Sequence, residues 1–341
     1  MNPLPTIVVR ADASPAIGTG HVMRCLALAQ AWMARDGAVC WAAAELPQPL
    51  SARLAREGVF ARMITPTGLE HDAAITGALA EEAGAACVVV DGYRFDGRYE
   101  ARVAEVAPVL AWDDTVHTDH TASRWVLNQN IHARPEMYPT LAPGRVLAGT
   151  KFAQLRREFW PLRQWKREVA PVARRLLVTL GGSDPTGTTR RVVGALTGNT
   201  GLDVTVVVGA AARFEPALQA AVERAGFRLV TDPPSMPELM AAADLAVSAG
   251  GSTAWEMLFM GLPAVTITLA DNQRPITAGL AQAGATLSHG WHAELDAVRL
   301  ADEVRTLAAD AARRRAMGAL GRTLVDGEGG ARVVAALKEQ P

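Results

Sequence analysis

The sequence opens with a strand-like run at residues 6–11, TIVVRA, and a glycine turn leads into a helix-like segment beginning within residues 17–24, IGTGHVMR. Beyond His21 the apolar residues recur at helical spacing. Gly18 and Gly20 let the backbone turn tightly and leave its N–H groups open to a ligand. A helix N-terminus favours negative charge, and His21 brings a titratable side chain to the same place. This pattern favours proton transfer beside an anionic group, although a glycine cap with an exposed histidine would look the same.

The alternation of strand and helix continues in two series. They are separated around residues 163–173, where the chain changes character beside a charged segment at 160–168. Apolar strands between helices indicate an α/β fold with mostly parallel sheets covered on both faces. We therefore predict two doubly wound, Rossmann-like domains, residues 1–163 and 164–341, with a ligand-binding cleft at the carboxyl ends of their strands. Strands are predicted at 7–11, 38–43, 86–90, 109–112, 125–127, 175–180, 203–208, 228–230, 244–248 and 264–269. Helices are predicted at 21–35, 48–57, 71–84, 97–106, 186–197, 214–225, 235–242, 252–260, 273–283, 299–325 and 330–339.

The composition narrows the class of protein. The chain has 341 residues, 49% of them hydrophobic, and a formal net charge of -1 from 34 basic and 35 acidic residues. This balance gives no basic surface for nucleic acid or an anionic membrane. The N-terminus lacks the features of a signal peptide, and no apolar stretch is long enough to span a bilayer. The three cysteines are an odd number and lack zinc-pair spacing, which favours a reducing, cytoplasmic compartment. We also expect a monomer, and no metal or other cofactor.

A glycine-rich turn opens the second domain at residues 180–189, LGGSDPTGTT. Gly182 and Gly187 have the separation found in the phosphate loop of ATPases, but Thr188 replaces the lysine that reaches the outer phosphates. The sequence therefore argues against ATP hydrolysis. The turn suits a diphosphate, or it is only a tight junction between a strand and a helix.

A second glycine turn, residues 248–258, SAGGSTAWEML, follows another predicted strand. Ser252 and Thr253 can cap the next helix while presenting hydroxyls to a phosphate. Glu256 is placed to accept the hydroxyls of a ribose, or it is a capping-box glutamate. After the next strand, residues 271–273, DNQ, offer a carboxylate and two amides to a sugar, or they cap the following helix.

Polar residues also follow strands of the first domain. Asp91 and Tyr93 are binding candidates, although turn chemistry alone places such residues there. The segment 113–120, DDTVHTDH, has two histidines three residues apart, which invites a metal site. Nothing in the sequence fixes a helix or a third distant ligand, so we predict a solvated polar loop.

Taken in order, these segments resemble the UDP-2,4-diacetamido-2,4,6-trideoxy-β-L-altropyranose hydrolases of pseudaminic (nonulosonic) acid biosynthesis, which are similar to the MurG-like glycosyltransferases. The resemblance covers most of the chain from residue 6 to about 285, and one departure is the glycine pair Gly250-Gly251 where some members carry serines. The matching segments are residues 10–14, 18–21, 91–93, 113–114, 149–152, 156–159, 181–184, 252–256 and 272–273.

The resemblance implies the glycosyltransferase-B architecture, with the sugar held by the first domain and UDP by the second. His21 matches the family's catalytic histidine. The residues implied in substrate binding are Asp12, Gly18, Gly20, Tyr93, Asn272 and Gln273. The residues implied in UDP binding are Gly181, Gly182, Ser183, Met236, Gly251, Ser252, Thr253 and Glu256.

The activity that the resemblance implies is hydrolysis of the UDP-linked diacetamido sugar to UDP and the free sugar, without a metal. Water would attack the anomeric carbon with inversion, and His21, with an ordinary pKa of about 6.5, would accept its proton. Two alternatives stay open: sugar transfer to an acceptor hydroxyl by a MurG-like glycosyltransferase, and a nucleotide-sugar binding protein without turnover.

Overall fold

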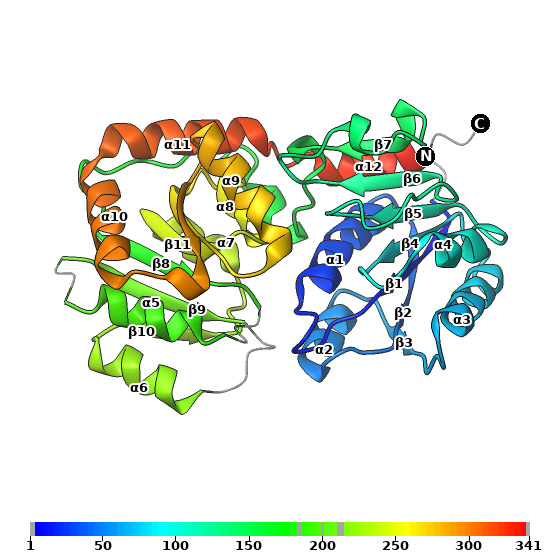
Figure 1. Ribbon diagram of the computed structural model, residues 1–341, viewed down its shortest axis with the longest axis horizontal. Helices are drawn as coiled ribbons and strands as arrows, with labels where there is room; N and C mark the ends of the chain where they lie inside the picture. The colour runs from blue at the N-terminus through cyan, green and yellow to red at the C-terminus, as the bar shows by residue number, and fades with distance from the viewer. Residues whose placement is uncertain (1–3, 183, 185, 199–200, 210–214, 339–341) are drawn as a thin grey trace. The chain divides into compact units, whose positions relative to one another are not determined.

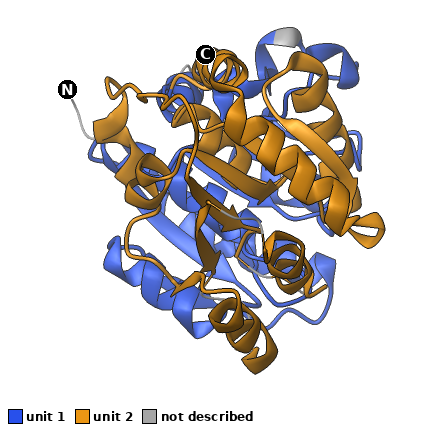
Figure 2. Ribbon diagram, turned by 90° about the vertical axis from the view of Figure 1, so that its left-hand side faces the viewer, with its two compact units in different colours: residues 1–157, 327–341 blue, residues 158–326 orange. Residues whose placement is uncertain are grey.

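The computed structural model describes residues 4–182, 184, 186–198, 201–209 and 215–338. The chain divides into two compact units, coloured separately in Figure 2: unit 1 comprises residues 1–157 and 327–341, and unit 2 comprises residues 158–326. Each unit is built on one parallel sheet with helices against it (Figure 1). The predicted α/β class, with two doubly wound sheets, is confirmed.

Unit 1 is organised by a seven-stranded sheet of order β3-β2-β1-β4-β5-β6-β7, in which all neighbours are parallel. Its central strands are buried apolar runs, as a sheet covered on both faces requires. The strands are β1 (Thr6–Ala11), β2 (Ala38–Ala43), β3 (Ala61–Met63), β4 (Cys87–Asp91), β5 (Val109–Trp112), β6 (Trp125–Asn128) and β7 (Val146–Ala148).

The helices of unit 1 pack on both faces of this sheet. They are α1 (Gly20–Met33), α2 (Gln48–Arg56), α3 (Leu69–Glu82), α4 (Gly97–Ala104) and α12 (Gly329–Lys338). Successive side chains of a strand point to opposite faces, so Ile7 and Val9 pack in one cluster with α1, α2 and α12. Val8 packs in another cluster with α3 and α4.

The strand order places β1 beside β4, and the helices that follow these two strands lie on opposite faces of the sheet. Open α/β sheets bind ligands at such a point, beyond the carboxyl ends of the two strands. His21 follows β1 and Tyr93 follows β4, so the fold brings these two candidate residues to one place.

Unit 2 has a six-stranded parallel sheet of order β10-β9-β8-β11-β12-β13. Its strands are β8 (Arg175–Thr179), β9 (Asp203–Val208), β10 (Arg228–Thr231), β11 (Leu245–Ala249), β12 (Ala264–Thr268) and β13 (Leu287–Trp291). Its helices are α5 (Thr188–Leu196), α6 (Pro216–Arg224), α7 (Met236–Ala242), α8 (Thr253–Phe259), α9 (Arg274–Ala283), α10 (Ala297–Ala309) and α11 (Ala311–Leu324). The short 3-10 helices of the two units together are η1 (Pro135–Met137), η2 (Pro143–Arg145), η3 (Thr150–Phe152), η4 (Arg157–Leu162), η5 (Asp271–Gln273) and η6 (His292–Glu294). Because β8 and β11 are neighbours, the turns after them meet at one edge of the sheet.

The compact units differ from the predicted domains 1–163 and 164–341. Unit 2 begins at residue 158. The guanidinium of Arg167 attaches the charged segment 160–168 to this unit by donating to the carbonyls of Met240, Ala243 and Met260. Helix α12 returns to unit 1, where Figure 1 shows it in red among the elements of that unit.

The secondary structure departs from the prediction in two respects. The strands β3, β7 and β13 were not predicted. The predicted helix 299–325 is two helices, because Asp310 ends α10 and its carboxylate caps the next helix by accepting from the Arg313 N–H. Within the described part of the chain, no helix combines the length and the apolar character needed to cross a membrane.

Candidate functional site

The turn before α1 is set by glycine. Gly18 has a φ of 82°, a left-handed value that favours glycine, and its N–H donates to the Ser14 carbonyl at 2.8 Å. The chain thereby folds back after β1 and enters α1 at Gly20. His21 then lies in the first turn of α1, at the carboxyl edge of the sheet.

The surroundings of His21 keep its ring neutral near neutral pH. The residue is 9% exposed, and its Nε2 lies 4.0 Å from Oδ1 of Asp91. The Tyr93 ring meets the imidazole edge-on, with ring centroids 5.0 Å apart. Burial lowers the pKa of His21 below its ordinary value, and the Asp91 carboxylate offsets only part of that effect. A neutral imidazole beside a carboxylate is able to accept a proton.

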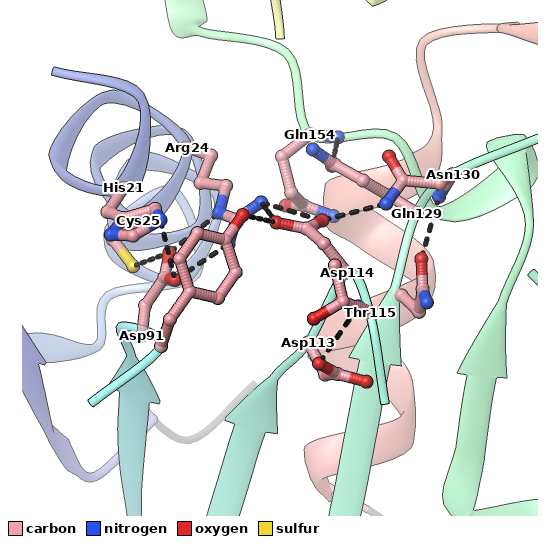
Figure 3. A network of polar contacts seen from close by, with 12 residues as sticks. His21, Arg24, Cys25, Asp91, Asp113, Asp114, Thr115, Gln129, Asn130 and Gln154 are labelled. Carbon is pink, nitrogen blue, oxygen red and sulfur yellow. Dashed lines mark hydrogen bonds and ion pairs between the residues drawn. The ribbon is translucent and has the colours of Figure 1, made fainter. Parts of the chain in front are cut away.

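A buried arginine links the carboxylates around His21. Arg24, one turn further along α1, donates from Nε and Nη2 to Asp91, with both distances 2.7 Å. Its Nη1 donates to the Oδ1 and Oδ2 of Asp114 at 3.0 and 2.7 Å. Figure 3 shows the guanidinium between these two carboxylates, with His21 and Cys25 from the same helix facing Asp91. One guanidinium thus serves two carboxylates, which leaves this cluster with net negative charge.

The other side of the cluster is completed from neighbouring strands. The Tyr93 hydroxyl donates to Oδ2 of Asp114 at 2.7 Å, and the Asn130 side-chain amide donates to Oδ1 at the same distance. Burial alone would raise the pKa of Asp114, but the Arg24 guanidinium and these hydrogen bonds lower it. Tyr93 is 41% exposed, so it reaches from the buried cluster to the surface.

Asp12, expected to bind substrate, is engaged within the fold. Its Oδ1 accepts from the Arg10 guanidinium at 2.7 Å and from the Ala44 and Glu45 N–H groups at 2.7 and 3.2 Å. Its Oδ2 pairs with Arg94 at 3.1 Å. These contacts make Asp12 a fixed part of the edge where β1 ends.

The segment 113–120 is not the solvated loop that the sequence suggested. Asp113, Asp114 and His120 are buried. Asp113 accepts hydrogen bonds from the Tyr138 hydroxyl at 2.6 Å and the Val116 N–H at 2.7 Å. Asp113 and His120 are held by partners from other elements, Tyr138 and Glu100, which the sequence does not reveal.

In unit 2 the helix that follows β8 already has an anionic cap. Gly181 has a φ of 99°, and a side chain on Gly209 would overlap the backbone of Gly182. The Asp184 carboxylate accepts from the N–H groups of Thr188 and Thr189 at 3.0 and 2.6 Å. A diphosphate would compete with that carboxylate at α5. Ser183, a predicted UDP-binding residue, lies outside the described residues.

The turn after β11 is the better diphosphate candidate in unit 2. Ser252 precedes α8 and its hydroxyl does not cap the helix, so it is not used there. A methyl group on Gly251 would have Gln273 Nε2 as its nearest neighbour, at 3.7 Å, whereas one on Gly250 would overlap the Thr277 side chain. Gly251 and Ser252 lie in this turn, Thr253 begins α8, and the buried Glu256 follows within that helix.

The remaining candidates of unit 2 lie on two other turns of the same edge. Asn272 and Gln273 belong to η5, after β12, and Gln273 Oε1 accepts from the Leu269 N–H at 3.0 Å. Met236 opens α7 after β10, which stands two strands away from β8 in the sheet. The turns after β8, β11 and β12 are thus neighbours, and Met236 is the more distant of the predicted contacts.

Sequence reasoning missed two members of the unit 1 cluster. Arg24 lies three residues after His21, on the same side of α1, and an arginine in an otherwise apolar helix was a usable signal. Asn130 carried no signal, because it joins the cluster only through the pairing of β5 with β6.

Part of the chain matches the model of a known protein family. Residues 177–321 match the family model described as the glycosyltransferase family 28 C-terminal domain. Most of unit 2 is therefore similar to that family. The chain is also 28% identical over 170 residues to the spore coat polysaccharide biosynthesis protein SpsG of Bacillus subtilis (strain 168). This match covers 49% of the chain and 50% of SpsG, so the chain spans about half the length of this curated relative.

Solved structures resemble the chain over nearly its whole length. MurG of Acinetobacter baumannii has a TM-score of 0.67 at 16% identity, covering 99% of this chain and 100% of MurG. The spinosyn rhamnosyltransferase SpnG complexed with thymidine diphosphate has a TM-score of 0.64 at 17% identity, covering 97% and 100%. At such identities the similarity establishes the fold alone. The predicted glycosyltransferase-B architecture is confirmed, and the hydrolase activity stays a prediction.

Proposed function

We propose that the protein hydrolyses a UDP-linked 2,4-diacetamido-2,4,6-trideoxy sugar, of the β-L-altropyranose type, to UDP and the free sugar. The observation that carries the proposal is His21, a neutral and largely buried imidazole 4.0 Å from Asp91, at the end of β1 in a glycosyltransferase-B fold. The similarity to SpsG and to the family 28 C-terminal domain supports chemistry on nucleotide sugars. A cytoplasmic location and a monomeric state stay predictions.

In the proposed reaction His21 is the general base. The oxygen of a water molecule attacks the anomeric carbon, the bond from that carbon to the diphosphate oxygen breaks, and UDP leaves with the bonding electrons. His21 takes a proton from the water, and the carboxylate of Asp91 stabilises the imidazolium that forms. The Tyr93 ring fixes the imidazole from the side, and its exposed part is available to the sugar.

Unit 2 would hold the UDP. Backbone N–H groups of the turn around Gly251 and the hydroxyls of Ser252 and Thr253 would bind the diphosphate and stabilise the charge that builds up on it. Glu256 would accept ribose hydroxyls. We assign the diphosphate to this turn rather than to the start of α5, because Asp184 already occupies that helix end.

Sugar transfer is the second candidate, because residues 177–321 match a glycosyltransferase domain and the rhamnosyltransferase SpnG shares the fold. In that case His21 would deprotonate an acceptor hydroxyl instead of water. The two reactions share the base and the UDP site, so they differ only in the nucleophile.

The deciding experiment incubates the purified chain with the UDP-diacetamido trideoxy altrose in heavy-oxygen water, with no acceptor. Hydrolysis predicts equal amounts of UDP and free sugar, an inverted first-formed anomer by NMR, and UDP without heavy oxygen. Heavy oxygen in the UDP would mean attack at phosphorus. UDP release only after an acceptor is added would establish transfer, and UDP binding without release from this substrate would reject hydrolysis.

A further inference from the structure

Three side chains of the segment 113–120 converge at one point of unit 1. Asp113, His117 and His120 each present a ligand atom, and these atoms all lie within 4.8 Å of one another. Two come from histidines and one from a carboxylate. We propose that this cluster is a binding site for a divalent transition-metal ion, a role that is independent of the proposed hydrolysis and departs from the metal-free protein expected from the sequence.

In each imidazole, the ring nitrogen that faces away from Asp113 already has a hydrogen-bond acceptor. His117 Nε2 lies 2.8 Å from the Phe95 carbonyl, and a carbonyl only accepts, so this nitrogen carries the proton. His120 Nδ1 lies 2.8 Å from Oε1 of Glu100 and donates to that carboxylate. Metal-binding histidines are oriented in this way, by a carbonyl or carboxylate on the other ring nitrogen. The other two nitrogens face Asp113: His117 Nδ1 is hydrogen-bonded to its Oδ1 at 2.9 Å, and His120 Nε2 lies near its Oδ2. A bound cation would replace the proton shared by His117 and Asp113 and would accept the lone pair of each imidazole.

One of these nitrogens has no hydrogen-bond partner, although it lies within ion-pair distance of Asp113. His120 is 0% exposed, and its Nε2 makes no hydrogen bond among the described residues. The nearest carboxylate oxygen, Oδ2 of Asp113, is 3.6 Å away, too far for a hydrogen bond. A buried polar atom without a partner is costly. A cation between His120 Nε2 and the Asp113 carboxylate would satisfy it.

The ligand set selects the kind of ion. Two imidazole nitrogens and one carboxylate oxygen suit Zn²⁺ and its neighbours in the first transition row, whereas Mg²⁺ and Ca²⁺ prefer oxygen alone. Three protein ligands leave a fourth position for water. The His117 side chain is 17% exposed, which gives an ion a path to the site. The Tyr138 hydroxyl, 2.6 Å from Oδ2 of Asp113, orients the carboxylate.

An ion here would brace the segment 113–120, which joins the His21 cluster through Asp114. The ring centroids of His117 and Tyr93 are 6.1 Å apart, and Tyr93 contacts His21 on its other side. The ion is therefore placed to stabilise unit 1 and to fix the position of Tyr93. It does not contact His21, so no step of the proposed reaction passes through it.

The test uses the full chain, stripped with a chelator and dialysed, and titrated with Zn²⁺ by calorimetry and thermal unfolding. We expect the wild type to bind one equivalent and to unfold at a higher temperature with Zn²⁺. His117→Gln keeps a donor for the Phe95 carbonyl but loses the ligand, and should weaken Zn²⁺ binding at least about 10-fold. His71→Gln, an exposed histidine of the same unit, is the control and should bind like the wild type.

Equal Zn²⁺ affinity in the wild type and His117→Gln would overturn the proposal, as would an equal loss in His71→Gln. If His117→Gln does not fold, Co²⁺ bound to the wild type decides instead. Intense visible absorption, as for a four-coordinate ion with nitrogen ligands, supports the site, and the weak spectrum of the hydrated ion rejects it.

Discussion

At the scale of single residues, the proposed chemistry depends on the burial of His21. Burial of the ring disfavours its charged form, so the pKa of the folded protein lies below the ordinary 6.5. A general base works only when neutral. The enzyme should therefore keep its full activity at neutral pH and lose it only when the pH falls through the lowered pKa of His21.

The pH profile tests this directly. The acid limb of kcat/KM reports the essential base of the free enzyme, so its midpoint should lie below 6.5, the ordinary pKa that burial lowers. The measurement is UDP release at low substrate concentration across the pH range, together with a check that the protein stays folded. An acid midpoint at or above the ordinary pKa would contradict the neutral, buried imidazole.

Loss of Arg24 should destabilise unit 1. Its guanidinium serves both Asp91 and Asp114, and all three side chains are buried. Arg24→Met removes the cation that pairs with two buried carboxylates and should lower the free energy of unfolding by about 3–5 kcal/mol. Urea unfolding measures the change.

A matched arginine on the surface provides the control. Arg62 pairs with Glu82 where the side chains are 59% and 70% exposed. Arg62→Met should change the free energy of unfolding by less than about 1 kcal/mol. If both substitutions had the same effect, the Arg24 cluster would not be a stabilising element of unit 1.

At the scale of elements, α12 belongs to the core of unit 1 although it comes last in the chain. Val333, Val334 and Leu337 are buried in the same cluster as the apolar face of α1. Leu337→Ala should lower the free energy of unfolding by about 2–5 kcal/mol, through lost burial and the cavity left behind. The adjacent, exposed Lys338→Ala should stay within about 0.5 kcal/mol of the wild type. Equal stability of Leu337→Ala and the wild type would mean that α12 does not pack in this core.

The two glycines before α8 should respond differently to the same substitution. In Gly250→Ala the new methyl group overlaps Thr277, whose hydroxyl is held by Thr268 and the Gln273 carbonyl, so unfolding should become easier by about 1–3 kcal/mol. Gly251→Ala has room and should leave stability unchanged, but it should weaken UDP binding if the diphosphate lies at this turn. Calorimetry with UDP measures this, and unchanged UDP affinity in Gly251→Ala would place the diphosphate elsewhere.

Central strands were predictable from the sequence, whereas of the edge strands β10 was predicted and β3, β7 and β13 were not. The strand β4, CVVVD, is buried along its whole length and therefore appears as an apolar run. At the sheet edges, β3 has only three residues, two of them exposed, and β13 contains Ser288, His289 and Gly290. Such strands are defined by pairing with a neighbour, which local sequence does not encode.

At the scale of the whole molecule, the alternation of strands and helices predicted two doubly wound sheets, and strand ends pointed to candidate residues on both. Two features of the structure could not be predicted from the sequence. The return of α12 to unit 1 depends on which core its apolar face joins. The burial of Asp113 and His120 depends on partners such as Glu100 and Tyr138, 20 to 25 residues away in the chain. Long-range packing decides both, and periodicity reports only local structure.

In the proposed reaction, His21 supplies the base while unit 2 binds the UDP. The most direct test measures UDP release from the UDP-diacetamido trideoxy altrose, and UDP affinity by calorimetry, for the wild type, His21→Ala and the surface variant His71→Ala. We predict that His21→Ala loses at least about 100-fold in release rate with UDP affinity unchanged, and that His71→Ala behaves like the wild type. UDP release at the wild-type rate in His21→Ala would contradict the role of His21 as the general base.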